Sequence, residues 1–166
     1  MSREKQRIAS TMLRVAAVLF PAGWAVVFLR RWDHRFGVTV PRWFQSPGIA
    51  LMSLGAFGVL WCAASLAACG IFEQKGSRLL PRALNTSGLF RLSRNPMSLS
   101  AVILFLGLGL YCRSVSIVLF SGFLFFLLHL VAVFVEEPKL RARFGDAYVE
   151  YERHTSRWLP FTRRDR

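Results

Sequence analysis

A small set of charged and polar side chains borders long apolar stretches in the second half of this chain. Arg94 and Asn95 precede one such stretch, His129 lies within the next, and the adjacent pair Glu136 and Glu137 closes it. Placing an ionisable group beside an apolar segment of membrane length costs free energy, so such groups more often bind a polar ligand than serve as ordinary surface residues. The pattern predicts a polar ligand site at one face of a membrane.

His129 lies seven and eight residues before the two glutamates, so an uninterrupted helix would place all three on roughly one face. A histidine bonded to a backbone carbonyl, beside glutamates that simply lie at the interface, is the structural alternative. Because the chain has only 9 acidic residues, two adjacent acids at the end of an apolar stretch favour a functional position. As a general base, His129 would take a proton from a bound amine, whereas a bound carboxylate is already ionised and requires no base.

Composition points to a membrane protein before any motif is considered. Of 166 residues, 54% are hydrophobic, and 22 Lys and Arg against 9 Asp and Glu leave a formal charge of +13. A nucleic-acid-binding protein can be this basic, but it would not carry long uncharged apolar stretches. The positive charge therefore indicates anchoring at a membrane surface rather than binding to nucleic acid.

The uncharged stretches between charged residues predict an all-α polytopic membrane bundle of about four transmembrane helices in one domain, residues 1–166. The spans are expected at residues 15–29, 43–72, 95–112 and 114–135. Asn95 is a suitable N-cap and Pro96 a suitable first helical residue for the third span. Arg113 and Ser114 leave room only for a tight hairpin before the fourth.

Lysine and arginine are concentrated in the second loop and the tail, which predicts that both are cytoplasmic. With an even number of spans, the N- and C-termini are then both cytoplasmic, at the inner membrane if the chain is bacterial. The first loop is the misfit, because it would carry four arginines to the other side: Arg30, Arg31, Arg35 and Arg42. We expect this loop to lie on lipid headgroups, with Trp32 and Trp43 as interface anchors; the alternative is that the first segment is a re-entrant hairpin.

The tail carries an apolar pattern of helical period, formed by Leu140, Phe144, Ala147, Tyr148 and Tyr151. It predicts a C-terminal amphipathic helix that Gly145 weakens without breaking. This helix either lies on the membrane or covers the ends of the third and fourth spans, with Arg157 and Trp158 closing the pocket.

Three cysteines show no metal-ligand spacing with the histidines, so no metal site is expected. Gly107 and Gly55 lie in apolar stretches and favour close helix packing.

The order of these motifs resembles the membrane methyltransferases that include isoprenylcysteine carboxyl methyltransferases and phosphatidylethanolamine N-methyltransferases. The resemblance covers about residues 88–161 and rests on RNPM at 94–97, EEPKL at 136–140, FGDAYVEY at 144–151 and SRWLP at 156–160. It implies S-adenosylmethionine as cofactor, bound between the third and fourth spans and the C-terminal segment. It also implies methyl transfer to a lipid or prenylated small-molecule substrate that enters from the bilayer.

Taken together, these patterns and the resemblance predict two groups of site residues. The catalytic residues would be Arg94, Asn95 and His129. The cofactor-binding residues would be Pro96, Met97, His129, Glu136, Glu137, Tyr148 and Arg157. Arg94 suits either the cofactor carboxylate or an anionic group of the substrate. Family members often have Arg-His-Pro with a tyrosine two residues on, whereas this chain has Asn95 and Ser98, a difference that leaves room for another substrate or for lost activity.

The leading hypothesis is an S-adenosylmethionine-dependent methyltransferase of the isoprenylcysteine type, because the tail is more similar to that branch. Phospholipid N-methylation is the alternative, since residues 94–97 and 136–138 are also similar to the phospholipid branch. A non-catalytic membrane scaffold or small-molecule carrier is a third hypothesis, favoured by the missing aromatic ring at Ser98. The sequence indicates no oligomeric state.

Overall fold

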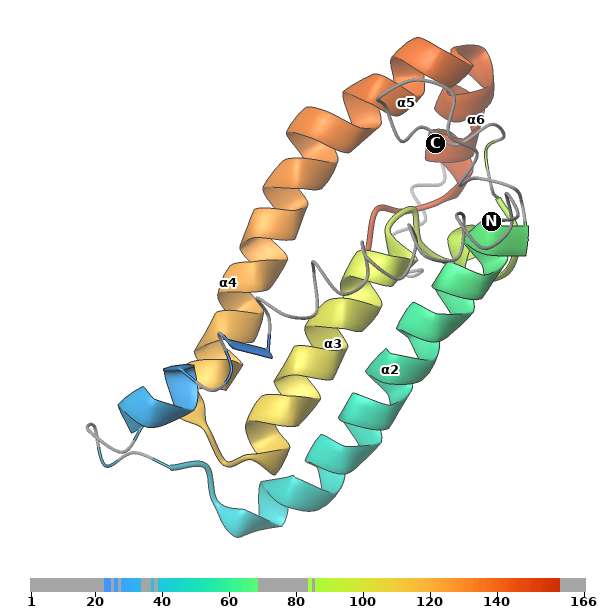
Figure 1. The fold of residues 1–166 in the computed structure, drawn as a ribbon. Coiled ribbons are helices and arrows are strands. Elements are labelled where there is room, and N and C mark those ends of the chain that lie inside the picture. The colour runs from blue at the N-terminus through green and yellow to red at the C-terminus, as the bar shows by residue number, and fades with distance from the viewer. Residues whose placement is uncertain are drawn as a thin grey trace, which may run out of the picture.

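The computed structural model describes residues 23–24, 26, 28–33, 37, 39–68, 84 and 86–158, and this part of the chain is helical (Figure 1). Its elements are η1 (Arg42–Phe44), α2 (Gln45–Ala68), η2 (Gly88–Arg91), α3 (Pro96–Tyr111), α4 (Val115–Val131), the π-helical turn η3 (Ala132–Glu136), α5 (Glu137–Phe144) and α6 (Asp146–His154). Among these residues no strand forms, and the β pairing is limited to an isolated antiparallel bridge between Thr39 and Ser114. The prediction of an all-α protein is confirmed.

Two helices in the described part of the chain are long and apolar enough to cross a membrane. They run from Arg42 to Leu66 and from Val115 to Phe144, with 25 and 30 residues. They agree with the second and fourth predicted spans. The third predicted span is a shorter apolar helix, α3, of 16 residues. The first predicted span lies mostly outside the described residues. The residues near its C-terminal end that the structure describes are helical.

Helices α2 and α3 run side by side in opposite directions, and α4 returns beside α3 and leans away from it toward its far end (Figure 1). Glycines permit the close approach of α2 and α3. A Cβ atom added to Gly55 would lie 2.7 Å from the Ser100 carbonyl oxygen, and one added to Gly107 would lie 2.7 Å from the Gly48 carbonyl oxygen. The expectation that these glycines serve helix packing is confirmed.

The hairpin between α3 and α4 is as short as expected. Arg113 adopts a φ of 56°, which a residue with a side chain rarely does, and Ser114 caps α4 by accepting a hydrogen bond from the Ile117 N–H at 3.2 Å. Pro96 is at the start of α3, as predicted. Asn95 occupies the N-cap position, but its side chain makes no capping hydrogen bond, so the predicted cap is present in position only.

The single C-terminal helix predicted through Gly145 is wrong. Gly145 has a φ of 53° and a ψ of −130°, a conformation open to glycine because it lacks a Cβ atom, and it ends α5. Helix α6 begins at Asp146 and folds back, so that the chain after it returns toward the start of α3 (Figure 1). Because of this break, α5 and α6 are two helices that meet at an angle beside the ends of α3 and α4, instead of one straight helix.

The prediction that His129 and both glutamates share one helix face is also wrong. In a regular helix of about 100° per residue, Glu136 would return to within about 20° of His129 and Glu137 to about 80°. The π-helical turn η3 contains one residue more, which turns all that follows back by about 100°. Glu137 therefore takes the place expected of Glu136 and is 4% exposed, while Glu136 is exposed.

Candidate active site at the ends of α3 and α5

Arg94, placed between η2 and α3, is a buried cation held by two carboxylates. Its side chain is 9% exposed, and its Nη1 lies 2.5 Å from Glu152 Oε1 and 3.3 Å from Glu137 Oε1. The Arg94 backbone N–H donates to the Ser156 carbonyl at 2.9 Å, which ties the start of α3 to the tail. A buried charge is costly unless paired, so these contacts explain how Arg94 is accommodated. Among the described residues, its Nε nevertheless has no hydrogen-bond partner.

Glu137, at the start of α5, is bound by the tail. Arg157 donates from Nε to Glu137 Oε1 at 2.6 Å and from Nη2 to Oε2 at 2.9 Å, a bidentate pair. Ser93 adds a hydrogen bond from its hydroxyl to the Arg157 carbonyl at 3.0 Å. The hydrogen bond to Glu137 raises the pKa of Arg157, against the opposing effect of its partial burial. The tail is therefore fixed to both α5 and the segment before α3.

Glu152 completes this ion-pair cluster, and the sequence analysis did not identify it. It accepts hydrogen bonds from Arg94 and, with both carboxylate oxygens, from Arg141 at 2.7 to 3.0 Å. Burial alone would raise the pKa of the Glu152 carboxyl, but the hydrogen bonds to Arg141 and Arg94 outweigh it and lower the pKa. The scarcity of acidic residues, which singled out Glu136 and Glu137, was the signal that could have found it.

His129 meets the tail through Trp158. The Trp158 indole Nε1–H donates to His129 Nδ1 at 3.1 Å, and the Trp158 ring lies 4.9 Å from that of Phe125, measured between centroids. An indole N–H can only donate, so His129 Nδ1 must be the acceptor. The neutral imidazole then carries its proton on Nε2, which presents a donor to any ligand beside it. His129 in this state is suited to binding an oxygen rather than to removing a proton.

Two tyrosines anchor α6 over this cluster. Tyr148 is 1% exposed, and burial raises its pKa, partly offset by the nearby Arg94. Tyr151 donates its hydroxyl to the Phe90 carbonyl, and burial, with Tyr148 adding to it, raises the pKa of Tyr151 to about 12. Both hydroxyls therefore stay protonated at neutral pH, and the Tyr151 hydrogen bond holds α6 against η2.

The structure brings together most, but not all, of the residues predicted for the site. Arg94, Glu137, Tyr148 and Arg157 lie in or against one cluster, and His129 joins it through Trp158. Pro96 is buried in the first turn of α3, and Asn95 is half-buried, with its backbone N–H donating to Ser93 Oγ at 3.2 Å. The two remaining residues, Met97 and Glu136, are exposed. Their predicted roles in cofactor binding remain predictions.

The described residues thus include two helices of membrane length and a buried ion-pair cluster between the start of α3, the start of α5 and the tail. Residues 43–147 match the family described as phospholipid methyltransferase, which is well over half of the chain. The chain therefore belongs to this family and is a membrane methyltransferase. No curated protein matches the chain significantly. The family match runs from η1 into α6, while Tyr148, Glu152, Arg157 and Trp158 follow it.

Proposed function

We propose that this protein transfers a methyl group from S-adenosylmethionine to a lipophilic acceptor, in the manner of the isoprenylcysteine carboxyl methyltransferases. The observation that carries the proposal is the closure of the tail over the ends of α3 and α4. Arg157 binds Glu137 and Trp158 binds His129, so residues of the predicted site from distant segments face one region. The acceptor would enter from the bilayer, along the apolar helices.

The polar groups of the cluster fit an amino-acid cofactor. Arg94 retains an unpaired Nε–H at a buried position, which is a donor for the cofactor carboxylate. The rings of Phe125, His129 and Trp158 offer faces that attract a cation such as a sulfonium. S-adenosylmethionine supplies an activated methyl group, and the protein has to hold donor and acceptor aligned and dry, an effect worth up to ~7 to 11 kcal/mol.

The hydrogen bonding of His129 favours a carboxylate acceptor. A carboxylate is already ionised at neutral pH, so it requires orientation and a hydrogen-bond donor but no base. With Nδ1 occupied by Trp158, His129 offers Nε2–H as that donor. An amine acceptor would instead require a group that takes a proton, and the carboxylates of Glu137 and Glu152 are already engaged by arginines.

Cofactor binding by purified protein in detergent tests the proposal by calorimetry. Arg94→Lys keeps the positive charge between Glu137 and Glu152 but removes the Nε–H, so we expect S-adenosylmethionine to bind about tenfold more weakly or worse. The matched control is Arg141→Lys, which also pairs with Glu152 but is half exposed. It should bind the cofactor like the unaltered protein. Absence of cofactor binding by the unaltered protein would reject methyl transfer and favour a scaffold or carrier.

Phospholipid N-methylation is the second candidate, because the chain belongs to the family described by that activity. The two candidates differ in the product they leave in a membrane. We would express the chain in cells that lack methylated phospholipids and extract their lipids. Mono- or dimethylated ethanolamine headgroups would establish the amine acceptor, whereas their absence together with methylation of a prenylcysteine carboxylate would establish the other.

We further propose four membrane crossings, with an amphipathic C-terminal region and both termini in the cytoplasm. The two long apolar helices support two crossings, and α3, extended by flanking residues, supports a third. The positive charge of the second loop and the tail favours the cytoplasmic side, the inner-membrane face if the chain is bacterial. The site would then open to cytoplasmic cofactor.

A further inference from the structure

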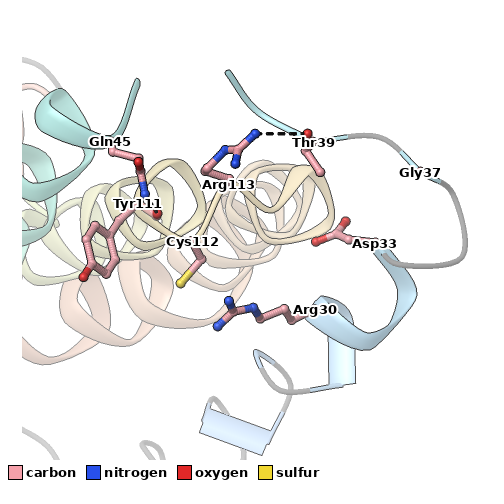
Figure 2. A pocket seen from close by; sticks show the side chains of 8 residues that line it. All are labelled: Arg30, Asp33, Gly37, Thr39, Gln45, Tyr111, Cys112 and Arg113. Atoms are coloured by element: carbon pink, nitrogen blue, oxygen red, sulfur yellow. Dashed lines mark hydrogen bonds between the residues drawn. The ribbon is translucent and has the colours of Figure 1, made fainter. Parts of the chain in front are cut away.

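A cavity of about 510 Å³ lies at the opposite end of α3 from Arg94. Its walls come from the helical residues before position 34, the segment before α2, and the hairpin between α3 and α4 (Figure 2). Helix α3 has 16 residues, so about 24 Å of helix separates the two ends. The cavity is therefore a separate feature from the Arg94 cluster, and the crossings proposed above would place it toward the other face of the membrane.

Two arginines and one aspartate supply the charges of the cavity. Asp33 Oδ1 accepts hydrogen bonds from the Ser116 N–H at 3.0 Å and from its hydroxyl at 2.6 Å, so this carboxylate caps the first turn of α4. Arg113 donates from Nε to the Val40 carbonyl at 2.8 Å and from Nη2 to the Thr39 hydroxyl at 3.4 Å. These bonds build the wall of the cavity and hold Arg113 in its unusual backbone conformation.

Arg30 takes no part in the hydrogen bonds made by Asp33 and Arg113, so its charge can bind a ligand. Its side chain reaches from its helix into the space beside Cys112 (Figure 2). Among the described residues, its guanidinium has no hydrogen-bond or ion-pair partner. A guanidinium presents a planar set of N–H donors that matches the oxygens of a phosphate. The cavity thus combines a free cation with the Thr39 hydroxyl and the Gln45 amide on its wall.

Exposed aromatic side chains mark this end of the molecule as a membrane interface. Trp32, Trp43 and Tyr111 are all exposed. Tyr111 lines the cavity, while Trp32 and Trp43 lie within two residues of lining residues in the chain. Tryptophan and tyrosine are enriched where headgroups meet the hydrocarbon. A phosphate at this end of the molecule would therefore most readily come from a lipid.

We propose that this cavity binds the phosphate of an anionic phospholipid headgroup, with Arg30 as its main ligand. The proposal accounts for one arginine of the first loop, Arg30, on the side of the membrane where few positive charges are expected. A lipid bound here would hold the helix of residues 28–33 against the hairpin. The site does not depend on methyl transfer, because it lies away from the Arg94 cluster.

The test compares two neighbouring arginines in purified protein in detergent. Both arginines are exposed and carry the same charge, but Arg30 lines the cavity and Arg31 does not. We would titrate unaltered protein, Arg30→Gln and Arg31→Gln with short-chain phosphatidylglycerol, following tryptophan fluorescence. Arg30→Gln should bind about tenfold more weakly or worse, and Arg31→Gln should bind like the unaltered protein.

Three further arms make the outcome decisive. Short-chain phosphatidylcholine should bind much more weakly than phosphatidylglycerol, and inorganic phosphate should neither bind nor compete at similar concentration. Equal losses in Arg30→Gln and Arg31→Gln would overturn the proposal in favour of general surface charge. Tight binding of inorganic phosphate would overturn the lipid as its source. S-adenosylmethionine binding should be unchanged in Arg30→Gln, so failure of this site is distinguishable from failure of the proposed enzyme function.

Discussion

At the scale of residues, the decisive contact is the hydrogen bond from Trp158 to His129. It places the imidazole proton on Nε2 because the indole can only donate to Nδ1. The histidine that looked like a possible base is therefore, in this arrangement, a donor held in position by the tail. Its role would be to orient an acceptor oxygen, which agrees with a carboxylate acceptor.

This state of His129 leads to a prediction for His129→Gln. Glutamine can accept from Trp158 through its carbonyl and donate through its amide, but it does not titrate near neutrality. We expect turnover to fall less than tenfold and the pH profile to remain flat from pH 6 to 8, against a loss of ~10² or more for a general base. A large, pH-dependent loss would favour the amine acceptor. The tautomer itself can be read from imidazole ¹⁵N chemical shifts in labelled protein.

At the scale of elements, the packing of α2 on α3 depends on glycine. No side chain fits where the two backbones approach at Gly107, since an added Cβ would lie 2.7 Å from the Gly48 carbonyl oxygen. Small residues at such contacts let membrane helices approach closely without a hydrophobic driving force. This pair of helices forms the support on which the start of α3, and with it Arg94, is placed.

The prediction at this scale compares two glycines in apolar helices. Gly107→Ala should destabilise the protein by about 1 to 3 kcal/mol, because backbone atoms would have to move to admit the methyl group. Gly122→Ala is the control, since no described neighbour lies within 4 Å of its added Cβ. It should be neutral or stabilising by about 0.5 to 1 kcal/mol through helix propensity. Thermal unfolding in detergent measures both, and equal effects would contradict this account of the packing.

At the scale of the whole molecule, one ion-pair cluster joins segments far apart in the chain. Arg94 and Glu152 are 58 residues apart, and Glu137 and Arg157 are 20 apart. Breaking a buried pair leaves an uncompensated charge, which is strongly destabilising. The cluster therefore couples the geometry of the candidate site to the docking of α6 and the tail.

Acid should undo this coupling. Because the folded state lowers the pKa of Glu152, its carboxylate stabilises the fold above its ordinary value of 4.5, and this stability is lost as pH falls through the lowered value. Glu152→Gln should be less stable than the unaltered protein at pH 7. Between pH 7 and pH 3 it should lose less of its stability than the unaltered protein does. Glu150→Gln, at a position whose side chain is 60% exposed, should follow the unaltered protein. Thermal unfolding at a series of pH values makes the comparison, and a Glu152→Gln curve parallel to that of the unaltered protein would contradict it.

The sequence by itself determined the features that depend on local composition. Uncharged stretches of membrane length marked the spans around α2 and α4, and two residues between apolar stretches required the hairpin at Arg113. Pro96 marked the start of α3, and the motif order indicated the family to which the chain belongs. These are local because hydropathy, turn length and proline geometry act over a few residues.

The tertiary structure alone decided how the site is assembled. The extra residue in η3 turns Glu137 inward and Glu136 outward, which helical periodicity could not show because it assumes 100° per residue. The corner at Gly145 brings Glu152 to Arg94, and the return of the tail brings Trp158 to His129. Such pairs form where separate segments meet in space, and the choice among many arginines and glutamates depends on packing across the whole chain.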